Sequence, residues 1–181
     1  MTLPSQVPTL RGDGSVVLRP FRDEDVQLVV AAASDPLIPL VTTVPRSGSE
    51  ADARAYIDRQ HQRLGEGEGY SFAVESARTG RAVGQIGLWT RDLAHGRAST
   101  GYWIAAEHRR RGYGRAALSA LTAWAMGLEE VQRLQLYVEP RNEASWRTAA
   151  ACGFAREGLL RSWQQVGAER RDMYVYSIVR S

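Results

Sequence analysis

The stretch that most constrains the fold is an arginine- and glycine-rich turn between a strand-like run and a helix-like run. Residues 99–105 form the strand-like run, residues 108–115 read HRRRGYGR, and a helical pattern opens at residue 116. Glycines let a backbone approach a ligand closely, and N–H groups at a helix start carry the positive end of the helix dipole. This order predicts a site for a phosphorylated ligand, although three adjacent arginines fit an ordinary solvated turn equally well.

The length and composition predict one soluble globular domain. The chain has 181 residues, of which 44% are hydrophobic and 24% charged, which suits a single domain with a sizeable core. No apolar run approaches the roughly 20 residues of a membrane span, and residues 1–5 lack the features of a secretory signal. The single cysteine, Cys152, excludes an internal disulfide. We therefore expect a cytoplasmic protein without membrane contact.

The basic residues are all arginines: the 23 Lys and Arg residues include no lysine, and the formal net charge is +3. Arginine offers a rigid fork of donors that suits phosphate and carboxylate groups. A compositional bias of the source genome explains the same pattern more simply.

Periodicity and turn signals predict a mixed α/β chain with a lead-in at residues 1–14 and a long loop at residues 35–48. Antiparallel segments flank a central strand–turn–helix–strand unit. The expected helices cover residues 26–34, 49–64, 113–126 and 142–152, and the expected strands cover residues 16–20, 70–75, 82–89, 99–105, 131–138, 154–162 and 172–179.

Several common sites are excluded by the motifs. No Gly-Lys-Ser/Thr follows the glycine turn, so a nucleotide-hydrolysing P-loop is not expected. The turn also lacks the GxGxxG pattern of dinucleotide-binding folds. His61, His95 and His108 have no metal-ligand spacing and no second cysteine, so we assign no metal.

Two further motifs narrow the interpretation. Arg109-x-x-Gly112-x-Gly114, together with Asn142-x-x-Ser145 and Gly153-Phe154, resembles the GNAT family of acetyl-CoA-dependent N-acetyltransferases. Residues 18–25 (LRPFRDED), 153–158 (GFAREG) and 170–176 (RRDMYVY) resemble more narrowly its Rim-type branch, the ribosomal-protein N-terminal acetyltransferases. The resemblance implies one α/β (α+β) domain over residues 15–181. Its mostly antiparallel sheet would have about seven strands and about four flanking helices, and would splay into a V between its fourth and fifth strands.

The resemblance also implies an acetyl-CoA site. The turn would hold the phosphates, and the splayed strand and the NxxS helix would line the pantetheine arm. A backbone N–H near Ile104 or Ala105 would bind the thioester carbonyl. The expected cofactor-binding residues are Tyr102, Trp103, Ile104, Ala105, Arg109, Arg110, Arg111, Gly112, Tyr113, Gly114, Arg115, Asn142 and Ser145.

Transfer requires a neutral amine and a proton for the leaving thiolate. Many family members carry a tyrosine acid where this chain has Ala149, whereas the Rim-type pattern uses a serine, which matches Ser145. Rim-type enzymes can carry a glutamate base where this chain has Gln164. Glu75 and Asp172 are substitute candidates for the base, although surface or turn roles suit both.

Without a dedicated base, the acceptor itself must supply neutral amine. An α-amine with a pKa near 8 is about a tenth neutral at pH 7, whereas a lysine near 10.4 is neutral at roughly one part in two thousand. We therefore expect direct attack by a protein N-terminal α-amine in a ternary complex.

Other interpretations stay open. The acceptor could be an antibiotic, a polyamine or another metabolite. The chain could also be a non-catalytic acyl-CoA binder or an RNA-binding protein, although its 20 acidic residues weaken the RNA interpretation and make nucleic acid an expected partner only through a ribosomal substrate. Trp89, Trp103 and Trp163 could serve a homodimer interface, an acceptor pocket or the core.

Overall fold

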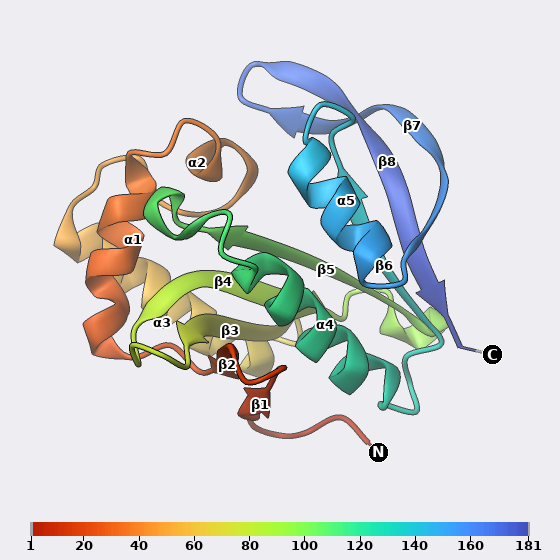
Figure 1. Ribbon diagram of the computed structural model, residues 1–181, viewed down its shortest axis with the longest axis horizontal. Coiled ribbons are helices and arrows are strands. Elements are labelled where there is room, and N and C mark those ends of the chain that lie inside the picture. The colour runs from red at the N-terminus through yellow and green to blue at the C-terminus, as the bar shows by residue number, and fades with distance from the viewer. Residues whose placement is uncertain (1, 181) are drawn as a thin grey trace.

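The computed structural model describes residues 2–180 as a single twisted sheet with helices on both faces (Figure 1). The strand order is β1-β2-β3-β4-β5-β6-β8-β7. The strands are β1 (Leu10–Arg11), β2 (Val16–Arg19), β3 (Gly69–Ser76), β4 (Ala82–Trp89), β5 (Arg97–Ile104), β6 (Arg133–Val138), β7 (Ala155–Val166) and β8 (Glu169–Val179). The helices are α1 (Val26–Ala33), α2 (Ile38–Val41), α3 (Glu50–Gly65), α4 (Tyr113–Met126) and α5 (Glu143–Ala151).

The predicted mixed α/β class is confirmed, with one strand and one short helix more than expected. The added strand β1 lies in the 1–14 lead-in and pairs Leu10 with Leu18 of β2. The added helix α2 lies in the expected loop 35–48, where Asp35 Oδ1 accepts the N–H groups of Leu37 and Ile38 and so starts the turn. Both additions depend on contacts with other segments, which local periodicity does not reveal.

Two apolar clusters hold the layers together. On one face, α4 buries Ala117, Leu118, Leu121 and Ala125 against the sheet, as its helical spacing predicts. On the other face, a second cluster joins α1 and α3 to the sheet through residues such as Trp103. Successive side chains of a strand point to opposite faces, so β5 serves both layers.

The feature that positions the site is a split between β5 and β6. These strands are parallel and pair only at Arg97–Arg133, Ala98–Leu134 and Ser99–Gln135, after which they diverge. They are the fourth and fifth strands when β1 is left out, so the expected V is confirmed. Helix α4 follows β5 and α5 follows β6, which brings both helix N-termini to the open end of the V (Figure 1). Ligands of parallel strands bind at this carboxyl end.

Candidate active site

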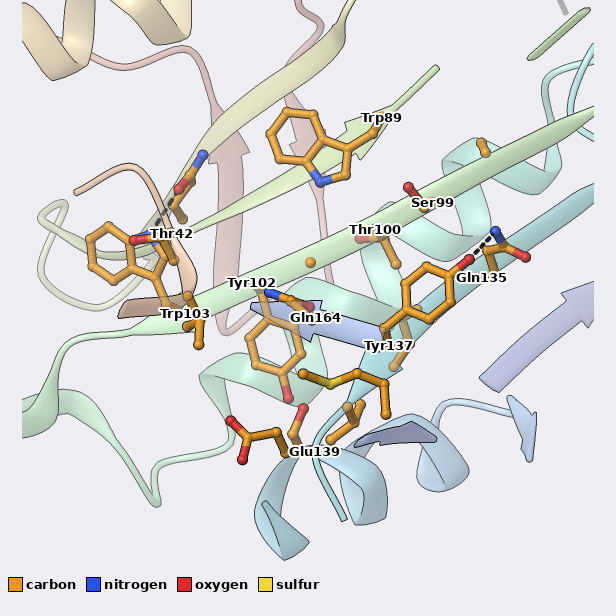
Figure 2. Close-up of a pocket in the computed structure, with 18 of the residues that line it drawn as sticks. Thr42, Trp89, Ser99, Thr100, Tyr102, Trp103, Gln135, Tyr137, Glu139 and Gln164 are labelled. Atoms are coloured by element: carbon orange, nitrogen blue, oxygen red, sulfur yellow. Dashed lines mark hydrogen bonds between the residues drawn. The ribbon is translucent and has the colours of Figure 1, made fainter. Parts of the chain in front are cut away.

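A cavity of about 520 Å³ lies along the V. Figure 2 shows side chains entering it from both walls, with Tyr102 on β5 and Tyr137 and Glu139 at β6. Asn142 and Ser145 line it from the start of the chain's last helix, α5. Further lining residues come from β5 and β6 themselves, and others come from α2 and its flanks, β4 and the β7–β8 hairpin: Leu37, Val41, Thr42, Gln85, Trp89, Gln164 and Met173. Of the predicted residues, Tyr102, Trp103, Asn142 and Ser145 therefore meet around one cavity.

The first arginine of the turn is engaged within the protein. Arg109 Nε donates to the carbonyl of Ile104 at 3.0 Å, and its Nη2 lies 2.6 Å from Asp35 Oδ2. Burial raises the pKa of the Asp35 carboxyl, but the N–H groups of Ile38 and Leu37 and the Arg109 guanidinium lower it more, so the net shift is downward. Arg109 thus ties the turn to the segment before α2 rather than standing free for a phosphate.

The rest of the turn is open to solvent. Arg110, Arg111 and Arg115 are exposed, and neither Arg110 nor Arg111 has an ion-pair partner within residues 2–180. Arg110 and Gly112 adopt left-handed conformations, with φ of 59° and 81°. Gly112 caps α4 without any side-chain hydrogen bond, which leaves the first N–H groups of the helix available. This part of the turn suits an anion.

Two residues of the motif act differently from the prediction. The Tyr113 side chain is buried, and its hydroxyl lies 3.1 Å from Ser76 Oγ, so only its backbone can face a ligand. A Cβ at Gly114 would lie 2.9 Å from Cε2 of Tyr102. Gly114 is therefore needed for the close approach of the Tyr102 ring to α4.

The backbone hydrogen bonds of β5 show which of its N–H groups are free to bind the carbonyl oxygen of a thioester. The N–H of Ala105 donates to Val83 O at 3.0 Å, so Ala105 is not free to bind a thioester carbonyl. Trp103 faces α1 and α3, where its indole donates to Gln85 Oε1 at 2.8 Å. The same oxygen accepts the Tyr56 hydroxyl at 2.5 Å, and Gln85 Nε2 donates to Ser71 Oγ at 2.8 Å. This network fixes β5 at the open end of the V.

The NxxS motif builds the start of α5. Asn142 caps the helix, with its Oδ1 accepting the N–H of Ser145 at 3.2 Å, so its amide nitrogen is left for a ligand. Burial raises the pKa of the Tyr102 phenol, and hydrogen bonding to the Ser145 and Thr148 hydroxyls lowers it by less. Ala149 is fully buried on the same helix. Ser145 and Tyr102 thus both line the cavity with hydroxyl-bearing side chains.

Neither predicted base reaches this cavity. Glu75 pairs with Arg19 at 2.5 Å and with Arg22 at 3.4 Å on β3, away from the V. Asp172 Oδ1 accepts the N–H of Ser162 at 2.8 Å and so supports a bulge in β7. Both carboxylates are occupied by structural contacts, which corrects their assignment as base candidates.

Two carboxylates that the motifs missed line the cavity instead. Asp92 is exposed, whereas Glu139 is buried at the end of β6 and lies 2.5 Å from Arg141 Nε. The alternation of β6 could have found Glu139, because it continues the face that carries Gln135 and Tyr137. Gln164 also lines the cavity, so the position expected to hold a base is in place but carries an amide.

The outer side of the cavity is partly covered by the β7–β8 hairpin. A Cβ at Gly167 would lie 3.3 Å from Leu40 Cδ2, so the hairpin tip contacts α2. The β7 bulge places Trp163 on Tyr137, with ring centroids 5.5 Å apart. The hairpin and α2 together form one wall of the cavity.

Two further properties concern residues 2–180 only. No cluster of three or more His, Cys, Asp or Glu side chains there could hold a metal ion. No helix in that range is long and apolar enough to cross a membrane.

Comparisons with known proteins agree with this geometry. A family model described as "Acetyltransferase (GNAT) domain" matches residues 15–155. The chain is 28% identical over 173 residues to YoaA, an uncharacterized N-acetyltransferase of Bacillus subtilis, with 96% of this chain and 97% of that protein covered.

Solved structures with the same fold include two Rim proteins. RimJ of Mycobacterium smegmatis, in complex with a CoA disulfide, has a TM-score of 0.77 at 24% identity over 96% of this chain and 86% of that one. RimL, a ribosomal L7/L12 alpha-N-protein acetyltransferase in complex with coenzyme A, has a TM-score of 0.80 at 16% identity over 95% and 98%. The family model therefore confirms the resemblance to the GNAT family, and the two Rim structures share its fold.

Proposed function

The chain belongs to the GNAT family and is an N-acetyltransferase, and from this premise we propose that it transfers the acetyl group of acetyl-CoA to a protein N-terminal α-amine. The observation that supports this most is the cavity in the V, at which the start of α5 and the free edge of β5 converge. We assign the activity to one domain over residues 15–181, with β1 extending its sheet.

The residues around the V fit an extended, phosphorylated thioester. Arg110, Arg111 and the first N–H groups of α4 suit the phosphates. The unpaired edge of β5 and the Asn142 amide suit the amides of the pantetheine arm. Thr100 Oγ1, buried in the wall of the cavity, has no hydrogen-bond partner within residues 2–180, so this wall also has an unused polar group for a ligand.

The chemistry we propose is direct attack by the neutral amine. Ser145 would protonate the leaving thiolate, and the free edge of β5, before Ala105, would supply the N–H for the carbonyl oxygen. Glu139, the buried carboxylate of the cavity, would receive the proton that the amine nitrogen loses.

The wall of the cavity formed by the β7–β8 hairpin and α2 favours a second class of acceptor, small-molecule amines. The contact between Gly167 and Leu40 joins the hairpin to α2 beside a cavity whose volume is ordinary for a small ligand. A small-molecule amine fits such a space, and so does a flexible N-terminus that enters it end first.

The test is release of free thiol from acetyl-CoA with a panel of amines. The panel holds peptides with free N-termini, the same peptides with blocked N-termini and an internal lysine, and small amines. We expect the fastest release with free N-termini, because more of their amine is neutral at pH 7. The chain has no lysine, so its own side chains cannot consume acetyl groups as amines.

Each outcome separates one alternative. Faster turnover of small amines would favour the metabolite acceptor. Binding of acetyl-CoA in calorimetry without thiol release would indicate a non-catalytic binder, and salt-sensitive RNA binding without acetyl-CoA binding would contradict the proposed function altogether.

A further inference from the structure

The phenol of Tyr102 occupies an unusual place in the V. Tyr102 lies on β5 beyond the last pair with β6, Ser99–Gln135, where the strand edge is free. Figure 2 shows its ring crossing the cavity from β5 toward Glu139. The side chain therefore bridges the two walls of the site.

The hydroxyl of Tyr102 meets one face of α5. The Ser145 and Thr148 hydroxyls both lie close enough to it to lower the pKa of the phenol, and these residues are three apart, so they share a helix face. Ala149, four residues after Ser145, is fully buried on the same side and contributes only a methyl group. Many GNAT enzymes carry their tyrosine acid at this helix position. Here a phenol reaches the same helix from the opposite wall.

The ring is held independently of its hydroxyl. It lies so close to α4 that a Cβ at Gly114 would be 2.9 Å from Cε2 and 3.6 Å from Cζ. Removing only the hydroxyl therefore leaves the packing of the ring in place. Burial also keeps the phenol protonated, since it raises the pKa of Tyr102.

We propose that Tyr102 is the proton source for the leaving thiolate, acting through the hydroxyl of Ser145. This inference rests on the proposed function. The amine nitrogen forms a bond to the acetyl carbon, the carbon–sulfur bond breaks and its electron pair leaves with sulfur. Ser145 gives its proton to sulfur while Tyr102 gives its proton to Ser145 Oγ. Glu139 takes up the proton that the amine nitrogen loses and passes it through water to the Tyr102 oxygen, which restores all three groups.

Elementary acidity favours this relay over serine alone. A phenol has an ordinary pKa of about 10, whereas an aliphatic hydroxyl does not ionise in the range where proteins work. Serine acting alone would be left as a buried alkoxide, which is costly unless a neighbouring donor supplies a proton. Tyr102 is positioned to be that donor.

The test compares Tyr102→Phe, Ser145→Ala and the double variant in the full chain. We expect Tyr102→Phe to lower kcat by about 10²-fold with acetyl-CoA, while the KM for acetyl-CoA changes little. The double variant should be no slower than the slower single variant, because both residues serve one proton transfer. The matched control is Tyr174→Phe, which removes a hydroxyl from a tyrosine on β8 that does not line the cavity and should leave kcat unchanged.

A second thioester separates chemistry from shape. S-phenyl thioacetate releases a more acidic thiol that needs no proton, so the defect of Tyr102→Phe should nearly vanish with it. A loss of equal size with both thioesters, or an unchanged kcat with acetyl-CoA, would overturn the relay and leave the acetyltransferase assignment intact. A wild-type protein that releases no thiol from acetyl-CoA would overturn the proposed function and the relay with it.

Discussion

Gly114 tests whether the glycine turn is shaped by the protein or by its ligand. In the structure, a Cβ at this position would lie 2.9 Å from Cε2 of Tyr102, 3.6 Å from its Cζ and 3.7 Å from Ile104 Cγ1. The first of these distances is shorter than any real Cβ contact, and the atom it meets belongs to a packed ring rather than a flexible chain end. Gly114→Ala must therefore displace the Tyr102 ring.

The free energy of unfolding reflects two opposing effects. Overpacking of this kind costs about 1–3 kcal/mol. Alanine in place of glycine in a helix gains at most about 1 kcal/mol. We expect a net loss of about 1 kcal/mol, which in a chain of this size lowers Tm by about 2–4 °C.

The residue at position 102 decides whether Gly114→Ala lowers or raises Tm. In a Tyr102→Ala variant the clashing ring is gone, so adding Gly114→Ala should raise Tm instead of lowering it. The difference between the two backgrounds gives a coupling free energy of about 1–3 kcal/mol between positions 102 and 114. The matched control is Gly65→Ala at the end of α3, where a Cβ meets no atom within 4 Å. It should be neutral or stabilising in both backgrounds.

The assay is thermal unfolding of the two backgrounds, wild type and Tyr102→Ala, each alone, with Gly114→Ala and with Gly65→Ala, followed by acetyl-CoA calorimetry. An increase in Tm for Gly114→Ala with Tyr102 present would refute the steric reasoning. If acetyl-CoA binding were lost at the same time, the glycine would serve the ligand rather than the ring.

Three further predictions follow from the contacts of single side chains. Asp172→Asn should lower Tm and raise the KM for the acceptor, because Asp172 supports the β7 bulge, while kcat should change little. A fall in kcat of about 10²-fold or more would restore the assignment of Asp172 as a base. Arg133 and Ser177 lower the pKa of Glu157 to about 2, so the stabilisation is present at neutral pH and is lost as pH falls from about 4.5 toward 2. The Tm difference between wild type and Glu157→Gln should therefore be largest near pH 7 and should disappear below about pH 3. A Tm difference that does not change with pH would contradict this assignment. Arg110→Gly should raise Tm, because glycine adopts a φ of 59° without strain. The same variant should raise the KM for acetyl-CoA, because a guanidinium is lost. An unchanged KM for acetyl-CoA would exclude Arg110 from the phosphate site.

The sequence predicted the parts of the site that depend on neighbouring residues. The turn at 109–115, helix α4 and the Asn142 cap with Ser145 are local patterns, and the structure places them as expected. The split of β5 from β6 came from the family resemblance and is also confirmed. The turn and the helix cap are each defined within a dozen residues of chain, whereas the split follows the last pair of Ser99 with Gln135, which are far apart in the chain.

The parts that could not be predicted depend on distant partners. Arg109 is joined to Asp35, which is 74 residues away in the chain, so no local pattern shows that its guanidinium is already engaged. Its carboxylate makes Asp172 a base candidate in the sequence. In the structure this carboxylate binds the bulge at Ser162, which arises from the register of two strands. Glu139 lies outside the motif that begins at Asn142, so only its place on the same strand face as Tyr137 indicates it.

The two glycines of the turn show how one motif can satisfy different physical needs. Gly112 has a φ of 81° and open space at its Cβ, so its role is conformational. Gly114 has no positive φ, and its Cβ space is filled by Tyr102, so its role is steric. Because the Ser145 hydroxyl lowers the pKa of that phenol, a glycine in the turn proposed to hold the phosphates sets the position of a hydroxyl at the proposed reactive end. This sequence has Ala149 where many family members have a tyrosine acid on α5. The phenol of Tyr102 can lie beside that helix only if the residue at position 114 stays small. Substitutions at positions 102, 114 and 149 should therefore have non-additive effects on catalysis.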